Sequence, residues 1–233
     1  MDKGKLIEHM IKEGELKSIA VEKAFMNVER GNFIPDDQKL MTYFDVPLSI
    51  SCGQTISAPS AIAKMLELAE LKKGLKVLEI GTGSGYNTAL ICEIIGEENV
   101  TTIERYPDLA KFAKENLRKN GYSKIEIICG DGSLGFPDNA PYDRIISTAA
   151  SPQIPFTWID QIKNMGLIIA PIGGHHLYQE LMTARKSSNG KINKLSHGSC
   201  VFVPLIGDLG FPEYSENLHP KGSGEEKIED KDK

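Results

Sequence analysis

Short apolar runs alternate with helical segments from residue 75 onward, and this alternation constrains the fold more than any other feature of the sequence. Helical periodicity occupies 86–95, 107–119 and 155–163, and the apolar runs lie at 75–80, 100–103, 125–129, 144–147 and 167–172. Strands that are apolar on both faces and joined by helices form a mostly parallel sheet with helices on both sides. The sequence therefore predicts an α/β fold built on a doubly wound, mostly parallel sheet.

The segments on either side of this core predict smaller additions to it. Two helical stretches within 4–30 form an N-terminal cap, and two antiparallel strands at 177–185 and 199–205 follow the core around a polar turn. We expect one domain over 1–220, with the cap and a substrate-side segment at 1–58, the core at 59–185 and C-terminal strands at 186–220. Nine of the last 13 residues are charged, so a disordered tail is expected at 221–233.

Composition limits the partners and the compartment. The 27 Lys and Arg against 32 Asp and Glu give a net charge of −5, so neither nucleic acid nor an anionic membrane is expected as the main partner. No apolar run is long enough to cross a bilayer, and charges interrupt the N-terminal residues where an export signal needs an apolar stretch. Four widely spaced cysteines fit a cytoplasmic protein. No metal site is predicted, because the adjacent His175 and His176 would point to opposite faces of a strand.

A glycine-rich turn follows the first apolar run of the core directly and leads into a helix. It reads Gly-Thr-Gly-Ser-Gly at 81–85, and glycines in this place let a ligand approach the backbone because no Cβ is in the way. A dinucleotide-binding turn has glycine or alanine in the sixth place, where this chain has Tyr86. The turn therefore predicts a Rossmann-like site that favours S-adenosylmethionine over NAD.

Three carboxylates fall at the ends of predicted strands. Glu79 precedes the glycine turn, Glu104 ends the second apolar run and Asp131 follows the third. Because parallel strands end at one edge of a sheet, Glu104 could accept both ribose hydroxyls there, and Asp131 could accept from an adenine amino group. This negative rim would repel a pyrophosphate and attract the sulfonium and ammonium groups of S-adenosylmethionine.

Further motifs along the chain carry a resemblance to a known family. The most specific is Gly-Gln-Thr-Ile-Ser-Ala-Pro at 53–59; the others are Val-Pro-Leu at 46–48, Thr-Ile-Glu-Arg at 102–105, Gly-Asp-Gly at 130–132, Pro-Tyr-Asp-Arg-Ile-Ile at 141–146, Thr-Ala-Ala at 148–150 and Phe-Val-Pro-Leu at 202–205. With the glycine turn, these motifs resemble the protein-L-isoaspartate (D-aspartate) O-methyltransferase family from about residue 24 to about residue 211.

The resemblance implies a protein repair methyltransferase. Members of the family move a methyl group from S-adenosylmethionine to the free α-carboxylate of an L-isoaspartyl residue, and the ester then closes to a succinimide that partly reopens as normal aspartate. The implied partners are damaged proteins and peptides that contain isoaspartyl residues. The sequence leaves open whether D-aspartyl residues are also accepted.

Carried over by position, the resemblance assigns the site residues. Ser57 falls on the active-site serine. The cofactor-binding residues are Pro59, Ser60, Glu79, Gly81, Thr82, Gly83, Gly85, Glu104, Asp131 and Gly132, with Glu79 and Gly81 at the methionine part. The substrate-binding residues are Thr55, Ile56, Ser57, Val203, Pro204 and Leu205.

Two of these positions keep alternatives open. Ser60 stands where the family usually has histidine; a carboxylate with a reference pKa of about 3.5 is ionised at neutral pH and needs no general base, so we expect this departure to affect substrate preference more than chemistry. Ser57 could instead be the N-cap of a helix that begins near Pro59. The N-terminus of that helix would also offer N–H donors and a positive dipole end to the substrate.

Two other functions stay open from the sequence. One is a related carboxylate O-methyltransferase that acts on another peptide acceptor. The other is a protein that binds S-adenosylmethionine and an isoaspartyl peptide without turnover.

Overall fold

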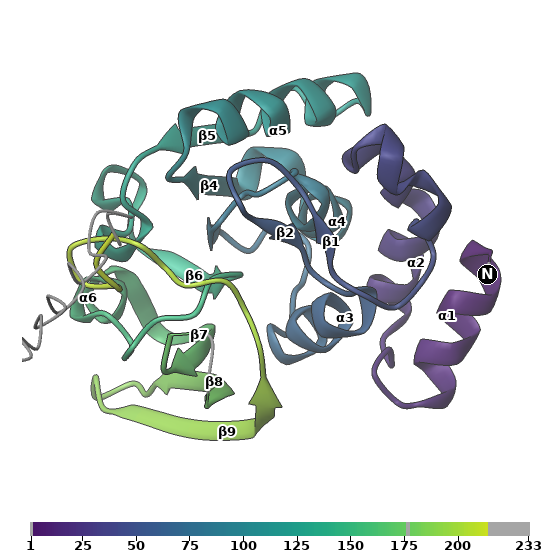
Figure 1. The fold of residues 1–233 in the computed structure, drawn as a ribbon. Helices are drawn as coiled ribbons and strands as arrows, with labels where there is room; N and C mark the ends of the chain where they lie inside the picture. The colour runs from purple at the N-terminus through teal and green to yellow at the C-terminus, as the bar shows by residue number, and fades with distance from the viewer. Residues whose placement is uncertain (1, 176–177, 214–233) are drawn as a thin grey trace, which may run out of the picture.

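The computed structural model describes residues 2–175 and 178–213, and the predictions for His176, for a strand start at Leu177 and for the tail at 221–233 lie outside this part. A seven-stranded sheet runs through the molecule in the order β5-β4-β3-β6-β7-β8-β9 (Figure 1). Strands β3 to β7 are parallel, and β8 and β9 are antiparallel to their neighbours. The prediction of a doubly wound, mostly parallel sheet is confirmed. The strands are β3 (Val77–Ile80), β4 (Val100–Glu104), β5 (Glu126–Cys129), β6 (Tyr142–Ser147), β7 (Ile162–Gly173), β8 (Gln179–Lys186) and β9 (Ile192–Cys200).

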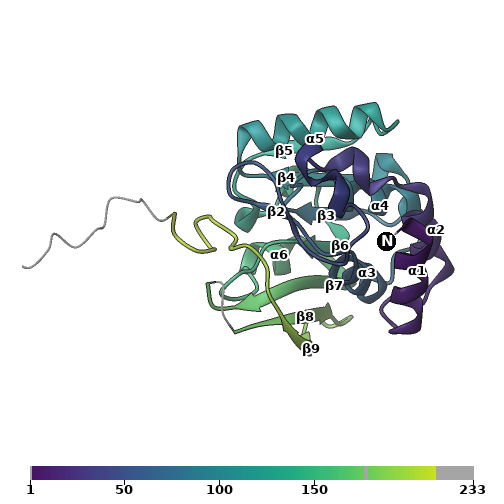
Figure 2. The same cartoon turned by 45° about the vertical axis from the view of Figure 1, so that its right-hand side comes forward.

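Helices cover both faces of the sheet (Figures 1 and 2). One buried cluster joins side chains of α1 to α5 to one face, and a second joins α6 to the other. The alternation along β3 shows this division, because Val77 belongs to the first cluster and its neighbour Leu78 to the second. The helices are α1 (Lys3–Lys12), α2 (Ile19–Asn27), α3 (Pro59–Leu68), α4 (Tyr86–Ile95), α5 (Pro107–Lys119) and α6 (Phe156–Gln161), and short 3₁₀ turns lie at Arg30–Phe33, Asp36–Met41, Glu97–Asn99, Gly132–Leu134 and Pro137–Asn139.

The predicted N-terminal helical cap is present, and local side chains start its helices. The Asp2 carboxylate accepts from the Lys5 N–H at 2.9 Å, and the Ser18 hydroxyl accepts from the Val21 N–H at 3.4 Å. Helix α2 packs on α4, where Phe25 meets Tyr86 edge to face. The chain then reaches α3 through a hairpin of two short strands, β1 (Leu48–Ser49) and β2 (Thr55–Ile56).

The strand order reverses beside β3, and this reversal opens the site. From β3 the chain runs outward to β4 and β5, and then returns to β6 on the other side of β3. Helices that follow β3 and β6 therefore leave in opposite directions, which opens a crevice at the carboxyl ends of these strands. The glycine turn and the residues just after β4 and β6 all lie at this edge.

The prediction for the last strand was wrong. The polar turn joins β8 and β9 as expected, but the second strand occupies Ile192–Cys200 instead of 199–205. Strand β9 is an edge strand with mostly exposed side chains, so it needs no apolar pattern, and the apolar residues after it misled the assignment. Those residues leave the sheet and cross back to the site, where Pro204 bridges to Ala150.

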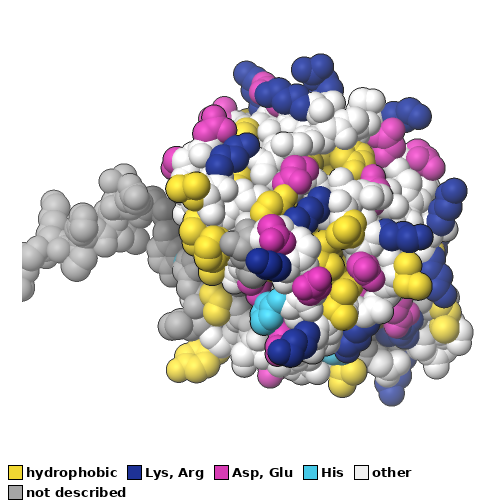
Figure 3. Space-filling model, turned by 90° about the vertical axis from the view of Figure 1, so that its right-hand side faces the viewer, with side chains coloured by type: hydrophobic (Ala, Val, Ile, Leu, Met, Phe, Trp, Pro, Cys, Tyr) yellow, Lys and Arg dark blue, Asp and Glu magenta, His cyan; other side chains and the backbone are white. Residues whose placement is uncertain are grey.

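The surface carries charges of both signs. On the face over the N-terminal helices, basic and acidic side chains are interspersed (Figure 3). Within the described part of the chain, no helix is both long and apolar enough to span a bilayer.

Candidate active site

Three adjoining pockets lie at the crevice. The pocket that we call the main pocket lies against the ends of β3 and β4, the β1–β2 loop and the segment after β9. The inner pocket reaches beneath the glycine turn toward Ser57 and Asn87, and the outer pocket lies between Ser57 and Val203. Thr55 and Thr148 line all three, so these two residues mark the centre of the site. The predicted site residues in the main pocket are Thr55, Gly81, Gly83, Glu104, Gly132, Val203, Pro204 and Leu205.

The glycines of the turn serve two different purposes. Gly81 has φ +91°, and a Cβ there would collide with the Thr148 hydroxyl, so the backbone at the pocket wall must stay bare. Gly85 lines none of these pockets. It has φ +90° at the N-terminus of α4, and a Cβ there would lie 2.9 Å from Leu117 of α5. In a dinucleotide-binding turn, the sixth residue of the glycine motif is small so that elements can pack closely. In this chain the fifth residue of the motif, Gly85, has that role.

Glu104 faces the main pocket from the end of β4. Its carboxylate accepts from the Gly83 N–H at 2.9 Å and from the Tyr106 N–H at 3.1 Å. Burial raises the pKa of this carboxyl, and the backbone N–H groups oppose the rise. Each oxygen keeps a free lone pair, so Glu104 can still accept from a bound diol.

Glu79 does not line the described pockets, so it is not part of a negative rim. It is fully buried beneath the glycine turn and accepts from Asn87 at 2.8 Å, from Thr88 at 2.5 Å and from Thr102 at 2.7 Å. Thr102 in turn shares a 2.8 Å hydrogen bond with Thr82 of the turn. This network ties β3, β4, α4 and the turn together, and burial raises the pKa of Glu79 to about 7.

Asp131 lies at the edge of the site instead of on a pocket wall. One oxygen accepts from the Ser133 N–H at 2.8 Å, and the other accepts from the Asp208 N–H at 2.7 Å. The carboxylate therefore fastens the loop after Leu205 to the end of β5. Its neighbour Gly132 lines the main pocket as predicted.

Ser57 lies in the inner and outer pockets, and its hydroxyl is not the cap of α3. The cap position is Ala58, which makes no side-chain cap bond, and the N–H of Ser60 in the first turn donates to Asp45 at 2.9 Å. Asp45 therefore caps α3 from 15 residues away. The expected positive helix end is already neutralised, so it is not free to hold a substrate carboxylate.

Pro59, Ser60 and Thr82 also do not line the main pocket. Pro59 is buried at the first position of α3, and Ser60 lines a depression between α3 and the end of β9 with the residues that follow. Ile56 and Thr82, by contrast, line the inner pocket.

Buried polar side chains that sequence reasoning missed hold the walls of the site. Arg30, 1% exposed, donates to the carbonyls of Thr42 at 2.7 Å, Val46 at 3.1 Å and Ser57 at 3.2 Å. The Gln179 side chain accepts from the Phe202 N–H at 2.7 Å and donates to the Phe202 carbonyl at 3.0 Å. Its amide thus pairs with the backbone of Phe202 as a neighbouring strand would. Neither residue lies in a sequence motif, and their roles are seen only from their hydrogen-bond partners in the structure.

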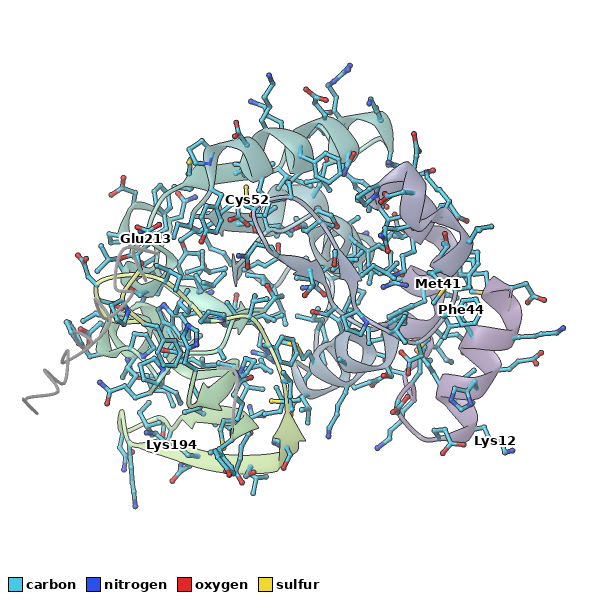
Figure 4. All side chains as sticks on the ribbon, in the orientation of Figure 1. Lys12, Met41, Phe44, Cys52, Lys194 and Glu213 are labelled. Carbon is cyan, nitrogen blue, oxygen red and sulfur yellow. The ribbon has the colours of Figure 1, made fainter. Side chains whose placement is uncertain are left out.

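The β1–β2 loop reaches over the site as well. Figure 4 labels Cys52 in this loop, between the two short strands. Gln54 and Thr55 of the same loop contribute to the main pocket, and Ile50 packs near Gly83 of the glycine turn. This loop thus forms one wall of the site.

Comparison with known proteins identifies the family. A family model described as protein-L-isoaspartate(D-aspartate) O-methyltransferase matches residues 1–210. This chain belongs to that family. Among curated members, the protein-L-isoaspartate O-methyltransferase of Pyrococcus horikoshii is 48% identical over 207 residues, which cover 89% of this chain and 94% of the relative. The enzyme of the same name from Thermococcus sibiricus is 49% identical over 211 residues and covers 90% of this chain and 95% of its own length.

Solved structures of protein-L-isoaspartate O-methyltransferases share the fold. One has a TM-score of 0.80 with 31% identity, over 90% of this chain and 67% of that chain. Another, from Plasmodium falciparum and solved in complex with S-adenosyl-L-homocysteine, has a TM-score of 0.78 with 27% identity, over 88% of this chain and 99% of that chain. The family resemblance predicted from the motifs is therefore confirmed.

Proposed function

We propose that this chain is an S-adenosylmethionine-dependent protein-L-isoaspartate O-methyltransferase that esterifies the free α-carboxylate of isoaspartyl residues in damaged polypeptides. The observation that carries the proposal is the meeting of three pockets at Thr55 and Thr148. One pocket has the donor and acceptor groups for a nucleoside, and another opens outward beside Ser57 to an acceptor chain. Family membership supports this reading.

The residues of the main and inner pockets fit the cofactor. Glu104 offers free acceptor positions for ribose hydroxyls, and Ile80, Ile103 and Leu205 give apolar walls for a base. In the inner pocket the Asn87 side-chain oxygen is buried and has no hydrogen-bond partner among the residues that the structure describes, which suits a donor such as an ammonium group. When bound, S-adenosylmethionine supplies an electrophilic methyl group.

The chain's own task is to hold and orient the acceptor carboxylate. A carboxylate with a reference pKa of about 3.5 is a nucleophile at neutral pH, so no base has to be found in the site. Ser57 can donate one hydrogen bond to it from the boundary of the inner and outer pockets. The Asp45 carboxylate at the start of α3 disfavours any pose in which the acceptor carboxylate lies on the helix end. Alignment of the acceptor carboxylate with the methyl group and exclusion of water from the site then accelerate the reaction.

An acceptor panel tests the proposal against its alternatives. Methyl transfer to an isoaspartyl peptide, with little transfer to the matching aspartyl peptide, is the expected result. Activity confined to unrelated carboxylates would indicate a methyltransferase with another acceptor. Binding of S-adenosylhomocysteine and peptide without release of methanol from a labile ester would indicate a protein without turnover.

Removal of the Ser57 hydroxyl should lower activity without lowering cofactor affinity. For Ser57→Ala we expect kcat/KM for an isoaspartyl peptide to fall about tenfold, the effect of one hydrogen bond to a charged group. The dissociation constant of S-adenosylhomocysteine, measured by calorimetry, should stay unchanged. Ser51→Ala, which changes an exposed serine of the β1–β2 loop, serves as the control. Unchanged turnover in Ser57→Ala would remove this serine from the active site.

Asp131→Ala should weaken cofactor binding. The variant frees the loop at Asp208 from the end of β5 and removes an acceptor at the edge of the pocket. Loss of a hydrogen bond between the carboxylate and the cofactor costs about 1–3 kcal/mol, which corresponds to roughly ten- to hundredfold weaker binding of S-adenosylhomocysteine. Calorimetry measures the effect, with Asp138→Ala at an exposed position nearby as the control. Equal affinities in the two variants would show that Asp131 does not support the cofactor site.

A further inference from the structure

A fourth depression continues the outer pocket along α3. The outer pocket is lined in part by Ala61, Val201 and Phe202, and the same three residues line the depression that contains Ser60 and Lys64. Its two walls are α3 and the C-terminal end of β9 with the residues that follow, which lie beside each other in Figure 1. We name this continuation the flanking groove.

The groove has the length and shape for a polypeptide that leaves the active site. Ala58, Ala61 and Lys64 recur at three-residue spacing, so they follow one side of α3 away from Ser57. Six residues of helix from Ala58 to Lys64 advance about 9 Å at roughly 1.5 Å per residue. An extended chain covers that distance in about three residues.

A positive charge marks the far end of the groove. The Lys64 ammonium donates to the His197 carbonyl of β9 at 2.8 Å, so it crosses between the two walls. None of the ion pairs among residues 2–175 and 178–213 includes Lys64, so no carboxylate of these residues lies within 4 Å of its ammonium. Glu15 lines the groove on the cap side. Burial and the nearby Asp45 raise the pKa of Glu15, and the charge of Lys64 opposes this rise, so Lys64 and Glu15 attract each other across the groove.

We propose that the flanking groove binds the acceptor polypeptide beside the isoaspartyl residue, and that Lys64 pairs there with an acidic side chain about three residues away from it. The proposal rests on the proposed function, because the methyl acceptor must lie at Ser57 for its chain to enter the groove. Continuity with the outer pocket identifies the occupant as that chain. The Lys64 ammonium, which has no carboxylate within 4 Å among the described residues, favours an acidic side chain in that chain. Glu15 opposes the same side chain by repulsion, so the two groups set the preference together.

A peptide panel tests this subsite. Isoaspartyl peptides that differ only in Glu, Gln or Lys three residues before or after the isoaspartyl residue are compared by kcat/KM. In the unmodified enzyme the Glu peptide should exceed the Lys peptide at least threefold on one of the two sides. Lys64→Met should reduce that ratio three- to tenfold, and Glu15→Gln should increase it, while kcat/KM for the Gln peptide stays within twofold.

Controls separate this subsite from a general effect. Lys12→Met removes a lysine from α1, where Figure 4 shows it at the outer edge of the molecule, and should leave every ratio unchanged. Thermal melting of Lys64→Met checks that the lost bond to His197 has not loosened the fold. If the ratio of kcat/KM between the Glu and Lys peptides is unchanged in Lys64→Met, the subsite is overturned while the proposed function stands. The same holds if kcat/KM falls by the same factor for all three peptides. Absence of transfer to every isoaspartyl peptide in the unmodified enzyme overturns the proposed function itself.

Discussion

Replacement of Arg30 by methionine is expected to disable the acceptor side of the site and to destabilise the protein. Its guanidinium donates to four carbonyls of the segment from Thr42 to Ser57, those of Thr42, Phe44, Val46 and Ser57. Each buried carbonyl left without a donor costs about 1–3 kcal/mol, so we expect the unfolding free energy to fall by at least about 3 kcal/mol. Ser57 would move with its backbone, and a displacement of about 1 Å in a site can lower the rate about 100-fold.

The measurement pairs urea unfolding with kinetics at a temperature where the variant is folded. Arg30→Lys keeps the charge, but a single ammonium cannot reach all the carbonyls that the guanidinium fork reaches, so its losses should be intermediate. Arg118→Met changes an exposed arginine of α5 and should match the unmodified protein. If Arg30→Met loses stability but keeps kcat/KM, the arginine supports the fold and does not position Ser57.

Periodicity and caps made the helical part of the fold predictable. The predicted helices at 86–95 and 107–119 coincide with α4 and α5, because each has local start signals: the glycine turn for α4 and Pro107 for α5. Strand β9 was misplaced because an edge strand is defined by backbone pairing, which leaves little trace in hydrophobicity. The apolar residues after it owe their burial to the crossing back toward β6, which only the tertiary structure shows.

The site was predictable where a residue's role follows from its place at the end of a strand. Gly81, Glu104 and Gly132 follow directly from strand ends and line the main pocket as expected. Glu79 looks the same in sequence, yet its three donors come from α4 and β4 and enclose it completely. Asp45 likewise takes over the cap of α3 from a distant segment, which no local cap motif could indicate.

Glu79 should make the stability of the protein depend on pH near neutrality. Burial raises the pKa of Glu79 from its ordinary value of 4.5 to about 7, so between these values the folded state binds more protons than the unfolded state. The stability that this group contributes is therefore complete below about pH 4.5 and is lost as pH rises through about 7. Glu104 acts in the same direction, because burial also raises its pKa.

Comparison with Glu79→Gln isolates the contribution of Glu79. The amide is neutral at every pH, so the unfolding free energy of the unmodified protein minus that of Glu79→Gln should fall as pH rises from 5 to 8. The slope should not exceed about 1.4 kcal/mol per pH unit, the limit for one proton. Urea unfolding at four pH values measures it, with Glu115→Gln at an exposed site of α5 as the control. A difference that rises with pH would mean that the three donors outweigh burial and that Glu79 stays ionised.

Glu79→Leu removes the acceptor altogether and should have the larger effect. Asn87, Thr88 and Thr102 would each keep a buried donor without a partner, at a cost of about 1–3 kcal/mol apiece. Thr102 would also lose its fixed orientation toward Thr82, so the glycine turn should loosen and S-adenosylhomocysteine binding should fall more than 100-fold. Thr102→Val cuts the connection to the turn but leaves Glu79 its other two donors, so it should weaken the cofactor with a smaller loss of stability. Equal losses of stability in the two variants would show that the donors Asn87 and Thr88 do not depend on Glu79 and would contradict this account.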